Sequence, residues 1–164
     1  MEIDSILAAL NRHEVRYLLI GGANFLLRHG PVLTYDVDIW IRDDAENRHR
    51  CAAALHDIDA RWGRSESEWK PVSQHHGDWL ADHPLFCMTT RHGPVDVFRF
   101  VDGLASWDAS KERALPSATA SGVAYLALCD EDMLLCQMAL PEETQKLDRI
   151  RALQRAIRKD ADHV

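Results

Sequence analysis

The sequence predicts an α/β (α+β) protein: a mixed, twisted sheet with helices flanking one face, followed by a helical C-terminal segment. Three observations support this prediction: a short apolar strand that ends at Gly-Gly, a strand that alternates acidic and apolar residues over 34–41, and an amphipathic stretch near the C-terminus. A chain of 164 residues suits one domain. We therefore expect a single domain over 1–164, with a core at 1–103 and a helical extension at 104–164 that has one strand near 122–128.

The composition excludes several classes of protein. The net charge is −7, from 26 acidic and 19 basic residues, which argues against a uniformly basic nucleic-acid-binding face. Apolar runs fall short of the ~20 residues that a membrane span needs, and the acidic start Met1–Asp4 lacks the features of a signal peptide. The four cysteines form no CxxC pair, so we expect reduced, mostly buried thiols in a cytoplasmic protein without a membrane partner.

In the N-terminal half, apolar spacing predicts helices and strands in alternation. Helical spacing predicts a first helix with Asp4 or Ser5 as its N-cap; the apolar residues at this spacing are Ile3, Ile6, Leu7 and Leu10. The apolar run Val15–Ile20 predicts a central strand that is buried on both faces. The other elements expected here are a helix at Ala23–His29, a strand at Thr34–Ile41, and a helix that Asp43–Asp44 caps and that reaches about Ile58.

The second half begins with an irregular stretch. Residues 59–84 predict mostly loop, with an edge strand near Pro71–Gln74. Leu85–Thr90 and Val95–Phe100 bracket a turn sequence, which predicts a hairpin with the four-residue loop Arg91–Pro94. Beyond it we expect a helix at Leu104–Ala114, a strand at Gly122–Leu128, a helix at Glu131–Leu140 that Asp130 caps, and a helix at Glu142–Lys159 with Leu147, Ile150, Leu153 and Ile157 facing inward.

Two acidic residues share one face of the predicted strand Thr34–Ile41. Asp36 and Asp38 stand at positions i and i+2, so they project from the same face, roughly 6–7 Å apart along the chain. Burying two unpaired carboxylates is costly, and a divalent cation between them removes that cost. Mg²⁺ prefers carboxylate oxygens and leaves room for substrate phosphates. The pattern indicates a metal site; the alternative is a solvated face of an edge strand.

A third carboxylate, Asp96, lies between apolar residues in the predicted strand Val95–Phe100. An acidic residue in such a strand is explained if the strand lies beside Thr34–Ile41 and presents Asp96 to the same cations. Three carboxylates around two cations are the arrangement that two-metal phosphoryl or nucleotidyl transfer requires. The alternative is a surface residue of the hairpin.

Gly21 and Gly22 follow directly after the buried strand. They allow the backbone to approach a phosphate, and the next helix would point its N-terminus at that phosphate. Taken alone, the pair also suits a tight turn from strand to helix.

In this order, the strand ending in Gly-Gly, the short helix, the Thr-x-Asp-x-Asp segment and the later apolar-Asp-apolar strand resemble the polymerase-β-type nucleotidyltransferase superfamily. Within it, the chain resembles small bacterial AbiEii-type toxins and minimal nucleotidyltransferases, most clearly over 15–100 and more loosely over 120–155. The resemblance implies a nucleotidyltransferase fold and Mg²⁺-dependent transfer of a nucleoside monophosphate from an NTP, such as ATP, to a hydroxyl of a protein or RNA. It also implies a place in a toxin–antitoxin or phage-defence module, with a cognate antitoxin as partner.

The resemblance also assigns roles to residues. Two Mg²⁺ ions, which Mn²⁺ can replace, would be bound by the catalytic carboxylates Asp36, Asp38 and Asp96, with Asp96 completing the site of the ion that activates the attacking hydroxyl. The residues expected to bind the nucleotide are Gly21, Gly22, Thr34, Lys146 and Arg149. Arg99 is a further candidate for supplying positive charge to the triphosphate.

Some positions depart from the family pattern. Relatives often carry an Arg near the position of Val32 and a Lys near the position of Gln137, and their Lys-Asp-x-x-Asp run is displaced here to Lys146–Arg149. These departures favour an alternative function, a catalytically weakened nucleotidyltransferase-fold protein that binds or regulates. A metal-dependent phosphohydrolase with the same carboxylates is a more distant alternative.

A second group of potential metal ligands lies in the irregular stretch: His75, His76, Asp78 and His83. Their spacing does not match the HExxH pattern of a zinc enzyme, so we expect a polar loop near the mouth of the site rather than a zinc centre.

Overall fold

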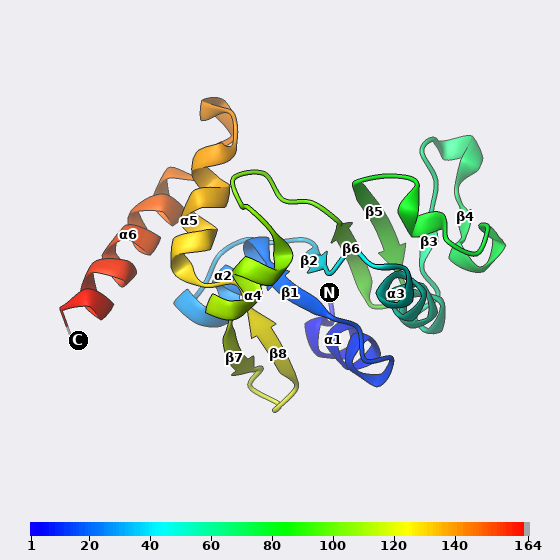
Figure 1. Cartoon of the computed structure of the whole chain (residues 1–164), viewed down its shortest axis with the longest axis horizontal. Helices are drawn as coiled ribbons and strands as arrows, with labels where there is room; N and C mark the ends of the chain where they lie inside the picture. Colours follow the sequence, from blue (N-terminus) through cyan, green and yellow to red (C-terminus); the bar gives the residue numbers. More distant parts are fainter. Residues whose placement is uncertain (163–164) are drawn as a thin grey trace.

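A mixed sheet of eight strands runs through the structure, a computed structural model that describes residues 1–162 (Figure 1). The strand order is β4-β3-β5-β6-β2-β1-β8-β7. The strands are β1 (Tyr17–Ile20), β2 (Val37–Ile41), β3 (Arg61–Trp62), β4 (Lys70–Pro71), β5 (Leu85–Thr90), β6 (Gly93–Phe98), β7 (Leu115–Ala118) and β8 (Ala124–Ala127). The helices are α1 (Ile3–Arg12), α2 (Gly21–His29), α3 (Ala45–Asp57), α4 (Trp107–Arg113), α5 (Asp130–Ala139) and α6 (Leu147–Ala161).

The strands β1, β2 and β6 form the centre of this sheet. β2 pairs antiparallel with β1 and parallel with β6, and β8 runs parallel to β1 on its other side. Every residue of β1 is buried, which confirms the predicted central strand. Because β2 has neighbours on both sides, the edge-strand alternative for Asp36 and Asp38 is wrong.

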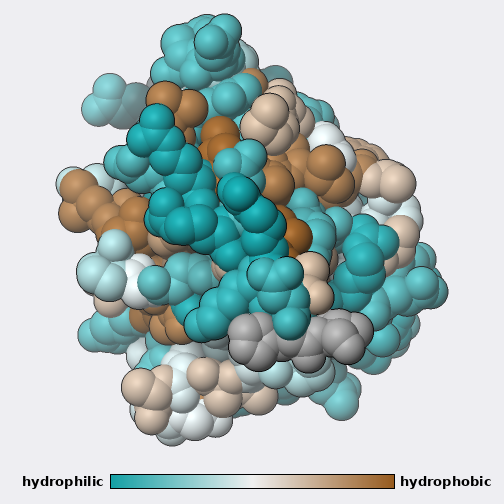
Figure 2. All heavy atoms as spheres, turned by 90° about the vertical axis from the view of Figure 1, so that its left-hand side faces the viewer, coloured by the Kyte–Doolittle hydropathy of each residue, from teal (hydrophilic) through white to brown (hydrophobic). Residues whose placement is uncertain are grey.

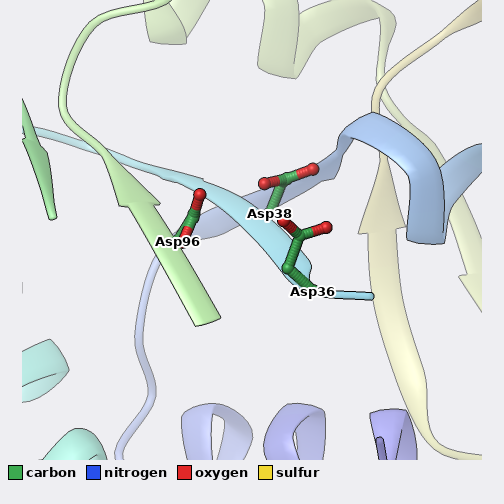
Figure 3. A group of neighbouring side chains, drawn as sticks. All are labelled: Asp36, Asp38 and Asp96. Carbon is green, nitrogen blue, oxygen red and sulfur yellow. The ribbon is translucent and has the colours of Figure 1, made fainter. Parts of the chain in front are cut away.

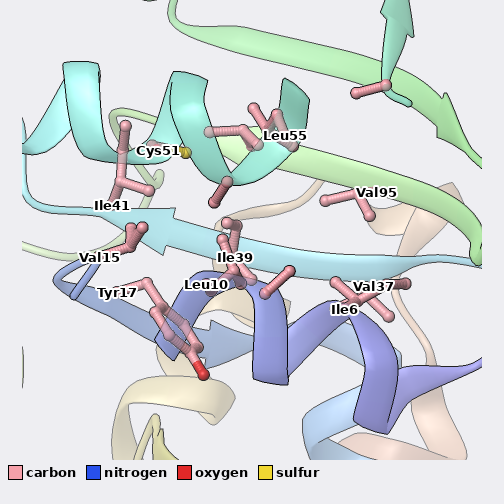
Figure 4. Packing of buried hydrophobic residues seen from close by; sticks show 14 of the residues in the cluster. Ile6, Leu10, Val15, Tyr17, Val37, Ile39, Ile41, Cys51, Leu55 and Val95 are labelled. Carbon is pink, nitrogen blue, oxygen red and sulfur yellow. The ribbon is translucent and has the colours of Figure 1, made fainter. Parts of the chain in front are cut away.

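One apolar core lies between the sheet and the helices α1 and α3. Leu10 of α1, Ile39 of β2 and Leu55 of α3 are fully buried in this core (Figure 4). Val37 and Ile41 belong to the same core, so alternate residues of β2 face it. The residues between them, Asp38 included, therefore face the opposite side of the sheet.

The opposite face carries a second apolar core, which involves α4, α5 and α6. Leu18 of β1 and Trp40 of β2 are buried there with Met133 of α5 and Leu153 of α6. The sequence predicts helices on one face, whereas the structure has them on both, because central strands with apolar residues on both faces need a cover on each. Within residues 1–162, no helix has both the length and the apolar character needed to cross a membrane.

The first two helices begin at different residues from those predicted. Glu2 precedes α1, so neither Asp4 nor Ser5 is its N-cap. The helix α2 begins at Gly21 rather than at Ala23, which places both glycines in its first turn. The diglycine is therefore part of the helix start rather than a turn before it.

Two predictions for the C-terminal helices are also wrong. Asp130 is the first residue of α5 rather than its cap, and it is buried against the side chains of Arg28 and His29. The helix α6 begins at Leu147 rather than at Glu142, because residues 142–144 form a separate 3₁₀ turn. Leu147 is 58% exposed instead of facing inward.

The predicted hairpin is confirmed as β5 and β6, with a shorter loop. Thr90 pairs with Gly93, so the loop is Arg91-His92 rather than four residues. The strand β7 was not predicted, since Pro116 within it argues against a strand. It lies at the edge of the sheet, where a missing N–H is tolerated.

An edge strand is present in the irregular stretch, but it overlaps the predicted strand Pro71–Gln74 only at Pro71. β4 covers Lys70–Pro71 at the other edge of the sheet, and Val72–Gln74 forms a 3₁₀ turn. All four cysteines lie in the described part of the chain and are free, as expected, but Cys87 is exposed rather than buried.

Candidate active site

The carboxylates of Asp36, Asp38 and Asp96 lie together at the centre of the sheet (Figure 3). Asp38 of β2 and Asp96 of β6 are partners in the parallel ladder, so their side chains project from the same face. Asp36 precedes β2, which begins at Val37 rather than at the predicted Thr34. One oxygen from each carboxylate lies within 4.8 Å of the others. The predicted convergence of this carboxylate cluster is confirmed.

The carboxylate cluster concentrates negative charge in a partly buried position. Burial raises the pKa of Asp38 to about 7, and the charges of Asp36 and Asp96 add to this effect. A hydrogen bond from the backbone N–H of Gly22 and the charge of Arg149 lower that pKa in part. Burial also raises the pKa of Asp96, and the charge of Asp36 adds to the rise. The cluster therefore favours either a bound proton or a bound cation.

The donor set fits a divalent cation. Carboxylate oxygens are hard ligands of the kind that Mg²⁺ and Mn²⁺ prefer. The oxygens already lie within 4.8 Å of one another, so one ion could contact more than one of them. Asp36, Asp38 and Asp96 are the residues that would hold it.

Gly21 and Gly22 bring the first turn of α2 against the carboxylate cluster. Gly21 has a φ of 64°, which favours glycine, and a Cβ atom there would overlap the carboxylate of Asp38. A Cβ atom at Gly22 would lie 2.5 Å from Oγ1 of Thr34 and 3.1 Å from Nη2 of Arg149. The N-cap residue Ile20 offers no side-chain acceptor to α2, whereas the N–H of Gly22 donates to the Asp38 carboxylate, which ties the start of the helix to the cluster.

The side chain of Arg149, a residue of α6, lies beside Gly22. Its guanidinium lies 5.8 Å from the centre of the Phe25 ring on α2. Lys146, just before α6, is exposed. The guanidinium of Arg99 binds both carboxylate oxygens of Asp43, at 2.9 and 2.8 Å, so the prediction that Arg99 serves a triphosphate is wrong. Of the three predicted cations, Arg149 is the one placed against the glycines.

A cavity of about 430 Å³ opens beside the carboxylate cluster. Gly21, Asp38 and Arg149 line one part of it. Most of the remaining lining is apolar, so we call it the apolar cavity; these residues include Leu85, Phe98, Phe100, Met133, Leu140 and Leu153. Gln137, at the position where relatives carry a Lys, also lines it.

Comparison with known proteins bears on the fold. No protein-family model matches the sequence, and no curated protein matches it. The crystal structure of ANT(2'')-Ia in complex with adenylyl-2''-tobramycin superposes with a TM-score of 0.61 at 15% identity, covering 94% of this chain and 87% of that one. The solution structure of ANT(2'')-Ia gives a TM-score of 0.52 at 14% identity, covering 98% and 91% of the two chains. ANT(2'')-Ia is an aminoglycoside nucleotidyltransferase.

This chain has the nucleotidyltransferase fold. The fold predicted from the Gly-Gly and the acidic strands is thereby confirmed. The narrower resemblance to AbiEii-type toxins stays a prediction.

Cys87 is a neighbour of the carboxylate cluster that the sequence did not indicate. It pairs with Asp96 across the β5–β6 hairpin, and its thiol donates to Oδ2 of Asp96 at 3.3 Å. Although the residue is exposed, partial desolvation of its sulfur and the charge of Asp96 raise the pKa of this thiol to about 12, so it remains protonated. A four-residue loop would have paired Thr89 with Asp96. The shorter hairpin loop was the signal that could have identified Cys87.

The second group of potential metal ligands, which the sequence places at 75–83, does not come together as one site in the described part of the chain. His76 pairs with Asp82 at 2.6 Å, while Asp78 binds Arg48 at 2.9 Å. The His75 ring packs against aromatic side chains. Among residues 1–162, the carboxylate cluster is the one group of this kind with metal-binding geometry.

Proposed function

We propose that this protein is a Mg²⁺-dependent nucleotidyltransferase, which moves a nucleoside monophosphate from an NTP to an acceptor hydroxyl. The observation that carries the proposal is the approach of Asp36, Asp38 and Asp96 to within 4.8 Å beside the start of α2. The fold of ANT(2'')-Ia, which was crystallised with an adenylylated small molecule, supports this class of reaction. The family resemblance points instead to a protein or RNA acceptor and a toxin–antitoxin setting.

The carboxylates and the acceptor carry out the chemical step. Asp36 and Asp38 would hold two Mg²⁺ ions, and Asp96 would join them at one. When bound, the ions neutralise phosphate charge and make the attacking hydroxyl more acidic. The acceptor oxygen forms a bond to the α-phosphorus, and the bond from that phosphorus to the bridging oxygen breaks. Its electron pair leaves with pyrophosphate, and Asp96 accepts the hydroxyl proton.

Gly21 and Gly22 at the start of α2, with Thr34 and Arg149 beside Gly22, would hold the triphosphate. Gly22 has no side chain, so a phosphate can approach the backbone N–H groups at the start of α2, where the helix dipole favours negative charge. Thr34 and Arg149 lie next to Gly22 and offer a hydroxyl and a guanidinium. A guanidinium can bind phosphate through two parallel hydrogen bonds.

Thermal unfolding of the wild type and Asp38→Asn tests the proposal without knowledge of the acceptor. Without metal, Asp38→Asn relieves repulsion and should melt at or above the wild type. Mg²⁺ with a non-hydrolysable ATP analogue at 100 times its Kd should stabilise the wild type by about 2.7 kcal/mol, worth roughly 2–4 °C per kcal/mol at this size. Asp160→Asn, an exposed carboxylate on α6, should respond like the wild type. A wild type that gains nothing from Mg²⁺ and the analogue contradicts the proposal.

A second candidate function is a nucleotide-binding protein without transfer activity. It is favoured by the cavity lining, because Gln137 replaces a cation and Arg149 is the one cation among the described lining residues. Release of labelled pyrophosphate from [γ-³²P]ATP distinguishes the two. Binding of Mg·ATP with no pyrophosphate released at any acceptor concentration would select the second candidate.

A further inference from the structure

The apolar cavity borders the side of the carboxylate cluster where the acceptor must lie. Phe98 follows Asp96 by two residues on β6, so both side chains project from the same face. Leu85 of β5 is the cross-strand partner of Phe98, and both line the cavity. Under the proposed function, on which this inference rests, the attacking hydroxyl lies at Asp96. A molecule that carries this hydroxyl would therefore extend over the wall formed by Phe98 and Leu85.

The residues proposed to bind the triphosphate lie at the edge of the cavity. Gly22 and Thr34 lie against each other, and neither lines the cavity. Arg149 lines the cavity and also lies near Gly22. A triphosphate bound by these residues would leave the apolar wall of the cavity to a second molecule.

The side chains that line the cavity indicate which chemical class of molecule it can bind. Among the described residues that line it, the charged ones are Asp38, Asp102 and Arg149, and Asp38 belongs to the carboxylate cluster. A polycationic acceptor would need more carboxylates, and an RNA backbone would need more cations. Apolar walls with few polar groups are typical of sites for largely apolar small molecules.

The rim of the cavity is also apolar. Phe100 is 61% exposed, and Leu85 and Leu140 are exposed as well. Apolar side chains lie open to solvent on the α5–α6 side of the molecule (Figure 2). A ligand that covers the rim residues would remove this apolar surface from water, which favours its binding.

We propose that the apolar cavity binds the acceptor, and that the acceptor is a neutral, largely apolar small-molecule alcohol. Its hydroxyl points toward Asp96, and its apolar body lies on Phe98, Leu85 and the rim. The product is the nucleotidyl ester of that alcohol, formed by the step described above, with pyrophosphate as the leaving group.

Binding of 2-naphthylmethanol, followed by its fluorescence, tests the cavity directly. The titration is made with the full chain in Mg²⁺ and a non-hydrolysable ATP analogue. Phe100→Ser and Leu140→Gln change exposed rim residues, so the fold should be kept, and each should raise the Kd of the alcohol at least tenfold. Met138→Gln, an exposed apolar residue of α5 outside the cavity, should leave it within twofold. The Kd of the ATP analogue should stay within twofold in all three variants.

Transfer from [α-³²P]ATP supplies the second readout. Four acceptors are compared: 2-naphthylmethanol, cyclohexylmethanol, tobramycin and an RNA dodecamer with a free 3′-hydroxyl. The neutral alcohols should be labelled fastest, and Phe100→Ser should raise their KM. Faster labelling of tobramycin or RNA overturns the proposal, as does failure to label either alcohol by an enzyme that binds Mg·ATP. Rim variants that weaken the ATP analogue and spare the alcohol would assign the cavity to the nucleotide.

Failure of the proposed function has a different signature. In that case Mg²⁺ and the ATP analogue fail to stabilise the wild type, whatever the alcohol does. Alcohol binding that persists without nucleotide binding would then show the cavity to be a ligand site unrelated to nucleotidyl transfer, which overturns the acceptor assignment.

Discussion

The carboxylate cluster and the arginine that faces it are held by very different parts of the molecule. Asp38 and Asp96 belong to β2 and β6, which pair with each other and with a further strand on their outer sides. Arg149 belongs to α6, whose buried residues are Ile150 and Leu153 and which packs mainly on α5. Strand pairing in the centre of a sheet positions side chains closely, whereas a terminal helix with few buried residues opens more readily. The carboxylate cluster is therefore held rigidly, and the arginine proposed to bind phosphate belongs to a less stable element.

The largest expected effect is the loss of transfer activity when a residue of the carboxylate cluster is replaced. Asp96→Asn removes a charged ligand while keeping the shape of the side chain. Transfer of labelled AMP should fall at least roughly 100-fold, since loss of even an outer partner of a metal ligand costs 10- to 100-fold. Asp160→Asn serves as the control for charge removal. An Asp96→Asn protein with wild-type turnover would remove Asp96 from the catalytic set.

The next effect concerns the glycine that lets α2 approach the cluster. Gly21→Ala places a Cβ atom at a φ of 64° and against the Asp38 carboxylate. Backbone strain of this kind costs about 1–3 kcal/mol, so the urea midpoint should fall accordingly. Gly77→Ala, where a Cβ atom meets open space, should stay within about 0.5 kcal/mol. Equal midpoints for the two variants would mean that the close approach at Gly21 is not required.

A substitution of Arg149, on the less stable helix α6, should affect nucleotide binding more than folding. Arg149→Gln removes hydrogen bonds to phosphate that contribute about 1.5–3 kcal/mol when charged, so the Kd of the ATP analogue should rise roughly 10- to 150-fold. The unfolding free energy should fall by about 1 kcal/mol or less, because the variant loses the contact between the guanidinium and the Phe25 ring. Arg151→Gln, also on α6, is the matched control. Calorimetric titration that finds equal affinity for both variants would place the phosphate partner elsewhere.

The last effect is a pH dependence of stability in the metal-free protein. Asp38 has a pKa raised from 3.8 to about 7, so the folded state binds a proton that the unfolded state has already released. Stability from this group is therefore present below about pH 4 and is lost as the pH rises to about 7, on the order of 1 kcal/mol per pH unit. Asp38→Asn should lack this loss. Urea unfolding from pH 4 to 8 measures the difference between the two proteins, and parallel curves would show that Asp38 ionises normally.

Patterns within a single segment were read correctly from the sequence. The alternation in β2 separates Val37 and Ile39 from Asp38 because successive side chains of a strand point to opposite faces. The glycines are indicated by their place directly after a buried strand, and Asp96 by its place between apolar residues of a strand. Predicted helix boundaries were wrong where a residue from a distant segment determines them. Asp130, for example, does not cap α5 but pairs with Arg28 of α2.

The sequence by itself thus determined the acidic face of β2, the diglycine and the order of the elements, since each depends on the geometry of adjacent residues. The pairing of the Asp96 strand with β2 was expected, and the tertiary structure determined its register, with Asp96 opposite Asp38. Only the tertiary structure decided that Cys87 is next to Asp96 and that Arg149 reaches Gly22. The tertiary structure also determined that the apolar cavity lies beside the carboxylate cluster. These features arise from pairing and packing between segments far apart in the chain. No local periodicity specifies which distant segments will meet.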